Sequence, residues 1–334
     1  MTDQTVETIN FDQERQNLIT AVATAYDLQK LRIMTGNRLC ANFRHKLGLQ
    51  ASESEDELEE QTKKVLDRVR ADFDLMTEGV VHITKPDGSL DVPRSNRFKP
   101  VGCITSLGEY MLVQQYLSLE AQEHDHFYKS LPSLLLNFRI FTHYLAHVKG
   151  IGPAMAAIII RYLDIHKAPY PSNFWAYAGL DVVNTEKNGE MTGRGRGRYK
   201  EHLVPRQYTD RSGEVTETMG ITFNPFFKTK LMGVMGGSFL KCKSPYAQVY
   251  YDYKNRLENH PKHMNKTKSH KHAMALRYMV KIFLVDLHAN WCELEGLPPS
   301  RTYQEIKLGH VHGGDEARPL LTHLMWPEDK RKPA

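Results

Sequence analysis

The five residues Lys149-Gly150-Ile151-Gly152-Pro153 have the types and spacing of a site where the main chain binds an anion. Two glycines around one aliphatic residue permit a tight turn and a close approach to a phosphate. Pro153 suits the first turn of a following helix, whose unpaired amides and positive dipole end would face the anion. The pattern predicts binding to the nucleic-acid backbone that does not depend on base sequence. The alternative is an ordinary helical hairpin with a glycine turn.

A second basic stretch, Gly193-Arg194-Gly195-Arg196-Gly197-Arg198-Tyr199-Lys200, alternates glycine with arginine. Guanidinium groups match the paired oxygens of a phosphate, and the glycines would leave the backbone loose enough to follow a strand. A solvated flexible loop is the alternative. Because the stretch follows the glycine hairpin, it favours phosphate contact through Arg194, Arg196, Arg198 and Lys200.

The segment 260–272 is rich in lysine and histidine and leads into the last expected helix. Its four histidines could chelate a metal, but the lysines between them repel a cation, and no thiol or carboxylate completes the ligand set. No metal site is therefore predicted, and phosphate contact is favoured through Lys266, Lys268 and Lys271. Upstream tyrosines could stack on bases, although aromatic side chains at helical spacing are usually core: Tyr246, Tyr250, Tyr251 and Tyr253.

Groups that could cleave a DNA strand are harder to identify. Ser238 and Ser244 lie near basic residues, but no base that would activate either hydroxyl stands out. The acidic residues are scattered, and each is interpreted as a surface charge rather than a metal ligand: Asp181, Glu186, Glu190, Asp252, Glu258 and Asp286. Catalytic residues stay unassigned, and Mg²⁺ is expected as a cofactor only if the chain cleaves DNA.

The elements that would carry these residues are mainly α-helical. Apolar residues at helical spacing predict helices over 12–34, 58–73, 106–122, 134–148, 154–163, 171–178, 225–241, 245–258 and 269–295. Turn residues predict small β-hairpins within 80–93 and around 210–213, and the rest of 182–223 is expected to be loops. The expected domains are a helical N-terminal region (1–130), a helix-hairpin-helix DNA-binding domain (131–297) with a basic arm at 187–222, and a C-terminal extension (298–334).

Charge is distributed unevenly along the chain. The formal net charge is +5, but residues 149–281 carry 22 Lys and Arg against 10 Asp and Glu, a net of +12. Such a segment is typical of a polyanion-binding surface. The first residues lack a signal-peptide pattern, no apolar run is long enough to span a bilayer, and the four cysteines have no zinc or redox spacing. We expect a cytoplasmic, nucleoid-associated protein that contacts no membrane.

Several stretches resemble, in their order, the C-terminal domain of the Piv-invertase and insertion-sequence one-ten transposases, over about 140 residues. The matching segments are Val148-Lys149-Gly150-Ile151-Gly152-Pro153, Pro171-Ser172-Asn173-Phe174-Trp175-Ala176-Tyr177-Ala178-Gly179-Leu180, the glycine and arginine stretch, Asn224-Pro225-Phe226-Phe227-Lys228-Thr229-Lys230-Leu231, Ser244-Pro245-Tyr246 with Tyr250-Tyr251, and Ser269-His270-Lys271-His272-Ala273-Met274-Ala275. The resemblance implies a DNA recombinase of a mobile genetic element. Its members combine a RuvC-like N-terminal domain with four metal-binding acids and a C-terminal serine that joins to DNA, and some use a structured guide RNA.

The chain departs from this family in two places. Its first 130 residues are predicted to be helical, with no opening strand that carries an aspartate, so none of the four acids can be transferred. After Ala178-Gly179-Leu180, where the family has its serine, the sequence reads Glu186-Lys187-Asn188-Gly189, and Thr185 and Thr192 are the nearest hydroxyls.

Binding is therefore better supported than cleavage. The favoured interpretation is a transposase-related protein that grips double-stranded DNA for DNA transposition or site-specific recombination. Two alternatives stay open: a transposase or recombinase that performs strand transfer with a replaced active site, and a non-catalytic DNA- or RNA-binding architectural protein derived from a transposase. A guide RNA and a homo-oligomer are further partners to be tested.

Overall fold

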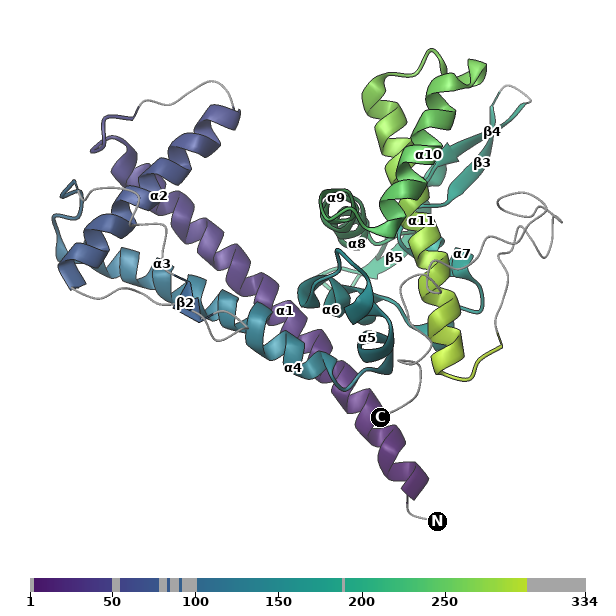
Figure 1. Ribbon diagram of the computed structural model, residues 1–334, viewed down its shortest axis with the longest axis horizontal. Helices are drawn as coiled ribbons and strands as arrows, with labels where there is room; N and C mark the ends of the chain where they lie inside the picture. The colour runs from purple at the N-terminus through teal and green to yellow at the C-terminus, as the bar shows by residue number, and fades with distance from the viewer. Residues whose placement is uncertain are drawn as a thin grey trace. The chain divides into compact units, whose positions relative to one another are not determined.

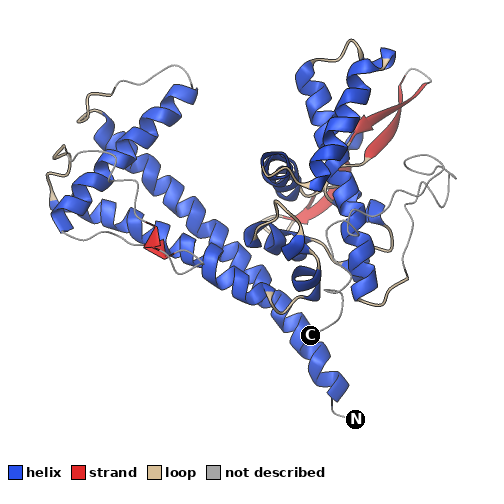
Figure 2. Ribbon diagram, in the orientation of Figure 1, coloured by secondary structure: helices blue, strands red, loops and turns tan. Residues whose placement is uncertain are grey.

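The computed structural model describes residues 3–49, 55–77, 83–84, 90–91, 101–187 and 190–298. These residues are mainly helical, as predicted, with three short antiparallel β-hairpins (Figures 1 and 2). The chain forms two compact units that meet between Asn137 and Phe138, seven residues beyond the domain boundary expected from the sequence. The expected C-terminal extension lies, after residue 298, outside the described residues. No helix within the described ranges is long and apolar enough to cross a lipid bilayer.

Unit 1 is built on three long helices that pack around one apolar core. They are α1 (Asp3–Arg44), α2 (Glu55–Thr77) and α3 (Leu107–Asp125), and α3 continues through the π-helical η2 (His126–Ser130) into α4 (Leu131–Leu135). The predicted helices are confirmed, and α1 extends beyond both ends of its predicted range. The core includes Leu39, Phe43, Val65, Val69, Phe73, Val113 and Tyr116.

Polar contacts set the ends and the packing of these helices. The Ser106 side chain accepts a hydrogen bond from the Glu109 amide while Glu109 bonds back to Ser106, so α3 begins where its cap is complete. Ion pairs then join the helices: Arg32 with Glu123, Lys46 with Glu109, and Arg70 with Glu120. The predicted hairpin within 80–93 is described only at β1 (Ile83–Thr84) and β2 (Leu90–Asp91), which pair antiparallel.

Asp72 of α2 holds the segment that leads into α3. Its buried carboxylate accepts hydrogen bonds from the amides of Val101 (2.6 Å), Gly102 (3.0 Å) and Cys103 (2.6 Å). Burial opposes ionisation, but the hydrogen bonds from Cys103 and its neighbours prevail and hold the pKa of Asp72 below its ordinary value. The carboxylate thus accepts hydrogen bonds from three main-chain amides that would otherwise bond to water.

We expect Asp72→Ala to lower the free energy of unfolding of unit 1 by about 2 to 4 kcal/mol, because three amides lose their acceptor. A carboxyl with a lowered folded-state pKa stabilises the fold above its unfolded pKa, near 4, and this contribution disappears as pH falls through the folded value. Urea unfolding at neutral and acidic pH measures both effects. Asp74→Ala, two residues along the same helix, is the matched control, and an equal loss in the two variants would contradict the assignment.

Unit 2 consists of short helices around a long one. They are α5 (Arg139–His143), η3 (Leu145–His147), α6 (Pro153–Tyr162), η4 (Ile165–Lys167), α7 (Pro171–Tyr177), α8 (Pro225–Thr229), η6 (Lys230–Met235), α9 (Gly236–Lys241), α10 (Pro245–Asn259), η7 (Pro261–His263) and α11 (Lys268–Leu294). Helix α11 contributes many of the buried residues of unit 2, and α10 packs along it (Figure 1). The ends of α7, α10 and α11 agree with the predictions, and α7 stops before Gly179, whose φ of +65° favours glycine.

The helix predicted over 134–148 is wrong as a single element. The chain leaves the helical conformation at Phe138 (φ −110°, ψ 114°), forms α5, and breaks again at Tyr144 (φ −134°, ψ −65°) before η3. The apolar spacing of this segment is helical, but the break at Tyr144 lets its hydroxyl meet that of Tyr246 at 2.9 Å inside the core. A tertiary contact between distant residues thus overrides the local periodicity.

The expectation of loops between 182 and 203 is also wrong. Strands β3 (Val182–Lys187) and β4 (Glu190–Gly195) form an antiparallel hairpin, and the short η5 (Lys200–His202) follows it. The hairpin expected around 210–213 is confirmed as β5 (Val204–Thr209) and β6 (Val215–Gly220). The Asp210 side chain closes its turn by accepting hydrogen bonds from the amides of Ser212 and Glu214.

Candidate nucleic-acid interface

The bend predicted to bind phosphate lies between η3 and α6, and α9 supports it from one side. Gly150 has a φ of +100°, a conformation that side chains other than glycine rarely adopt. A β-carbon at Gly150 would lie 2.9 Å from Cδ1 of Phe239, and the Ser238 hydroxyl donates a 2.8 Å hydrogen bond to the Gly150 carbonyl. Gly150 is therefore required by packing and conformation, independently of any ligand.

The other side of the bend is open. Lys149 and Gly152 are exposed, and a β-carbon at Gly152 would meet no atom within 4 Å. Gly152 is the N-cap of α6, where no side chain caps the helix, and its carbonyl accepts from Met155 and Ala156. Within the described residues, the amides of Gly152 and Ala154 have no hydrogen-bond partner. Unpaired amides at a helix start, beside an exposed lysine, have the donors and polarity to bind a phosphate oxygen.

A buried aromatic and polar network fixes the position of α9, and hence of the bend. The ring of Phe239 stacks on that of Tyr246 at 5.2 Å and meets Phe283 edge-on at 5.5 Å. The Tyr246 hydroxyl donates a 3.0 Å hydrogen bond to Asp286, which is completely buried. The expectation that Asp286 is a surface charge is therefore wrong. Burial, with the neighbouring Tyr144 and Asp286, raises the pKa of Tyr246 far above its ordinary value, so the hydroxyl stays protonated and can donate.

Two parts of the glycine and arginine stretch differ in what their side chains do. Arg194 of β4 is exposed and lies over the Tyr199 ring, 3.3 Å from its centroid, with a loose contact to Glu201 at 3.4 Å. Arg198 and Lys200 are exposed as well and have no ion-pair partner among the described residues. All three cations are exposed and can contact a polyanion, although Arg194 already contacts Tyr199 and Glu201.

Arg196, in contrast, is occupied inside the protein. Its guanidinium makes two hydrogen bonds to the Asp181 carboxylate, at 2.7 and 2.6 Å, and a third to the Thr222 hydroxyl. Its carbonyl accepts from Lys228 at 2.8 Å. Arg196 therefore anchors the base of the β3–β4 hairpin, and its predicted role as a direct phosphate ligand loses support.

The glycines of this stretch do not provide the loose backbone that the sequence suggested. Gly195 is paired with Val182 in the β3–β4 hairpin, and a β-carbon there would overlap Nη1 of Arg277 from α11. A β-carbon at Gly197 would lie 2.7 Å from the Tyr199 ring. Neither glycine leaves room for a side chain, so this part of the chain is closely packed and is not a flexible loop.

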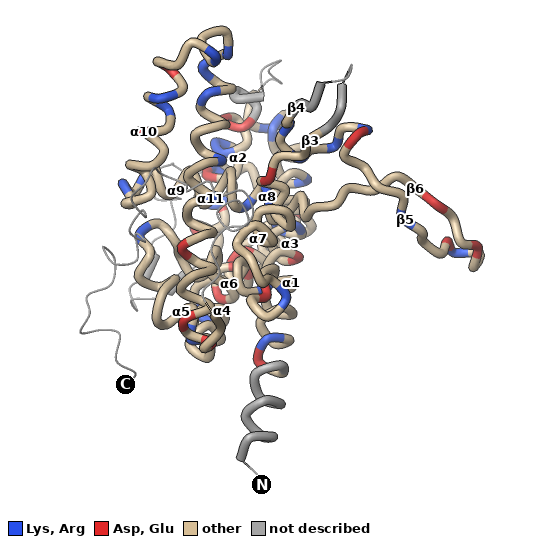
Figure 3. Tube along the Cα trace, turned by 90° about the vertical axis from the view of Figure 1, so that its right-hand side faces the viewer, with Lys and Arg blue, Asp and Glu red and all other residues tan. Residues whose placement is uncertain are grey.

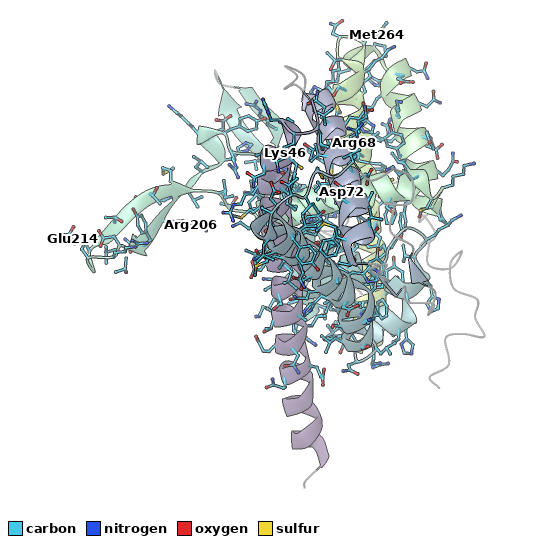
Figure 4. All side chains as sticks on the ribbon, turned by 90° about the vertical axis from the view of Figure 1, so that its left-hand side faces the viewer. Lys46, Arg68, Asp72, Arg206, Glu214 and Met264 are labelled. Atoms are coloured by element: carbon cyan, nitrogen blue, oxygen red, sulfur yellow. The ribbon has the colours of Figure 1, made fainter. Side chains whose placement is uncertain are left out.

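The predicted basic arm divides into two hairpins of different charge. Residues 187–203 carry five Lys and Arg against two Asp and Glu, whereas β5 and β6 with their turn carry two against three. The β5–β6 hairpin projects from the helices of unit 2, with acidic positions along β6 and at its turn (Figure 3). Arg206 lies near its base and Glu214 near its end (Figure 4). The excess of positive charge is therefore concentrated on the first hairpin and η5.

A third basic surface lies where α10 turns into α11. Exposed Lys268 opens α11, whose cap is the Thr267 hydroxyl, while Lys266 and Lys271 are half-buried. Met264 at this turn is 68% exposed (Figure 4). A small pocket beside the turn has a mostly basic and aromatic lining: Tyr253, Arg256, Leu257, His260, Lys262 and His263. Among the described residues, no three His, Cys, Asp or Glu side chains are grouped so that they could hold a metal ion.

The tyrosines of α10 differ in burial, which decides between a core role and stacking on bases. Tyr246 and Tyr250 are buried, and Tyr253 stacks on Tyr278 with ring centroids 4.3 Å apart. Tyr251 is 55% exposed and keeps one face available. The core interpretation therefore holds for most of this group.

The serines considered for catalysis lie in structural surroundings. Ser238 donates to Gly150, and Ser244 is buried at the start of α10. Thr185 and Thr192 lie directly opposite each other in the β3–β4 register. Asp181 is paired with Arg196. None of these residues is assigned to catalysis.

Sequence reasoning missed Lys228, Arg277 and Lys281, which the structure places beside Arg196 and Asp181. Each interacts electrostatically with Asp181, and Arg277 also interacts with both lysines. Their separation along the chain hides the group, although Arg277 and Lys281 give one signal. Two basic residues four apart interrupt the otherwise apolar and aromatic helix stretch 275–285, on adjacent turns of one face.

Comparisons of the chain with protein-family models, with curated proteins and with solved structures find no match.

Proposed function

We propose that unit 2 is a transposase-related DNA-binding module of a mobile genetic element, which grips the DNA backbone for DNA transposition or site-specific recombination. In this proposal, the segment formed by α5, η3, the bend and α6 works as a helix-hairpin-helix. The observation that carries the proposal is the open side of the bend, where the Gly152 and Ala154 amides lack partners beside exposed Lys149. The transposase relationship itself rests on the sequence resemblance.

Exposed cations elsewhere on unit 2 support the same proposal. Arg194 is exposed in β4, Arg198 and Lys200 are exposed after it, and Lys268 is exposed at the start of α11. Amides at a helix start fix the register of one phosphate, while exposed cations supply affinity that depends on salt. Neither kind of contact reads a base, so the proposed binding is independent of sequence.

We expect Gly152→Val to weaken binding to duplex DNA about tenfold, or about 1.4 kcal/mol, because its side chain occupies the space that the phosphate needs. The fold should tolerate valine, since Gly152 has an extended backbone (φ −94°, ψ 172°) and open space around it. Fluorescence anisotropy of the full chain with two unrelated labelled duplexes measures affinity, and the thermal midpoint reports folding.

Gly108→Val is the matched control, because Gly108 opens α3 in unit 1 and also has open space at its β-carbon. Equal DNA affinity in Gly152→Val and the wild type would reject the bend as the contact. Failure of the wild type to bind any duplex would reject the proposed function. Tighter binding to an RNA duplex than to DNA would replace it with the RNA-binding alternative.

A further inference from the structure

Four basic side chains of unit 2 gather around one carboxylate, and we call them the basic cluster. Arg196 follows β4, Lys228 belongs to α8, and Arg277 and Lys281 lie one turn apart on α11. Asp181, just before β3, is the acid that they share. Elements that are distant in sequence thus bring like charges together, which requires either compensation or a ligand.

Each member of the basic cluster is held in place by a different contact. The Lys228 ammonium donates a 2.8 Å hydrogen bond to the Arg196 carbonyl. The Lys281 ammonium lies 4.0 Å from the centroid of the Trp175 ring. The Arg277 guanidinium occupies the space that the missing side chain of Gly195 leaves open. The cluster is therefore preorganised and does not consist of mobile surface side chains.

The single carboxylate does not neutralise this group. Arg196 takes both oxygens of Asp181, and no other carboxylate pairs with Lys228, Arg277 or Lys281 among the described residues. Nε of Arg277 is buried without a hydrogen-bond partner. Half-buried cations without a carboxylate partner cost folding free energy, so their grouping points to a compensating anion.

The protonation equilibria agree with an excess of positive charge. Burial, reinforced by the charge of Arg277, lowers the pKa of Lys228 and that of Lys281 to about 8 each. Burial also lowers the pKa of Arg277. Both lysines are still largely cationic at pH 7, and a bound anion would raise the pKa of each again.

We propose that Lys228, Arg277 and Lys281 bind one phosphate group, supplied by the nucleic-acid backbone. A guanidinium fork and two ammonium groups from separate elements suit a tetrahedral anion with several oxygens. This inference rests on the proposed function, and it adds a contact distinct from the bend. Arg277 lies six residues beyond Lys271, about 9 Å along α11.

Inorganic phosphate tests the site without DNA. At equal ionic strength, replacing chloride with phosphate at about ten times its dissociation constant should raise the thermal midpoint of the wild-type chain by about 3 °C. Lys228→Met and Lys281→Met should lose this shift. Each removes a cation that lacks a carboxylate partner and keeps much of the apolar stem, so both variants should fold. Gly195→Ala should also lose the shift, because its methyl group displaces Arg277 without changing any charge.

Lys230→Met is the matched control, because Lys230 lies two residues after Lys228, at the start of η6, and burial alone lowers the pKa of its side chain. It should keep the shift. No shift in the wild type, or an equal shift in all variants, would overturn the site; an equal loss in Lys230→Met would show an adventitious ion only and overturn it too.

The DNA arm of the experiment identifies the source of the phosphate. For Lys281→Met, the slope of log affinity against log salt should become less steep by about 0.9, the value for one lost phosphate contact. An unchanged slope in a wild type that binds DNA would overturn the nucleic-acid source while leaving the proposed function standing. If the wild type binds no DNA but shows the phosphate shift, the proposed function fails separately, and the nucleic-acid source is overturned with it.

Discussion

Phe239→Ala is expected to lower the free energy of unfolding of unit 2 by about 3 to 5 kcal/mol, the usual cost of deleting a fully buried phenyl ring. Phe239 has no exposed surface, stacks on Tyr246 and meets Phe283 edge-on. Its ring is also the nearest side chain to the Gly150 bend. The substitution leaves a cavity between α9, α10 and α11 and removes the support of the bend.

Urea unfolding followed by circular dichroism measures this loss. Phe226→Ala is the matched control, because Phe226 is 37% exposed in α8, where its ring centroid lies 5.9 Å from that of Tyr162 and 5.2 Å from Nζ of Lys230. Phe239→Leu, which fills most of the cavity, should recover more than half of the stability. A loss in Phe239→Ala no greater than that in Phe226→Ala would mean that the aromatic stack does not hold unit 2 together.

Neutralising the exposed cations after β4 should have the largest effect on binding. The triple variant Arg194→Ala, Arg198→Ala, Lys200→Ala is expected to weaken DNA affinity about a hundredfold at low salt and to reduce the salt slope by about 2 to 3. Arg196 is left in place, since its guanidinium is bound to Asp181 and its loss would disturb the hairpin base. The expected effect is electrostatic, so it should shrink as salt is raised.

The second hairpin provides the control for this variant. Arg206→Ala with Arg211→Ala removes two cations from the β5–β6 hairpin, where acidic residues outnumber basic ones. We expect less than a threefold change in DNA affinity from this double variant, because positive charge is not in excess on this hairpin. Equal losses in the triple and the double variant would show that net charge alone, and not the position of the cations, governs binding.

Local patterns predicted most of the helices because their determinants lie close in sequence. Ser106 and Glu109 mark the start of α3, Gly179 marks the end of α7, and the apolar repeat of α11 extends from Ala275 to Cys292. The bend at Gly150 was predicted too, although its reason was incomplete. Its positive φ serves packing against Phe239, whereas Gly152 has the open side.

Features that depend on distant residues were not predictable from spacing. The break at Tyr144 follows from its contact with Tyr246, and the burial of Asp286 follows from the same network. Strands β3 and β4 contain few apolar residues, so no alternating pattern revealed them. The basic cluster needs Asp181, Lys228 and Arg277 to meet in space, which no short window of sequence can indicate.

The Arg277 guanidinium fills the space that a side chain at position 195 would need. This packing links β4 and α11, which are far apart in sequence. Any homologue that carries a side chain at position 195 of β4 should have a smaller residue at position 277 of α11, so the two positions are expected to covary. Likewise, a chimera that grafts a foreign β3–β4 hairpin onto this scaffold must exchange the facing turn of α11 with it.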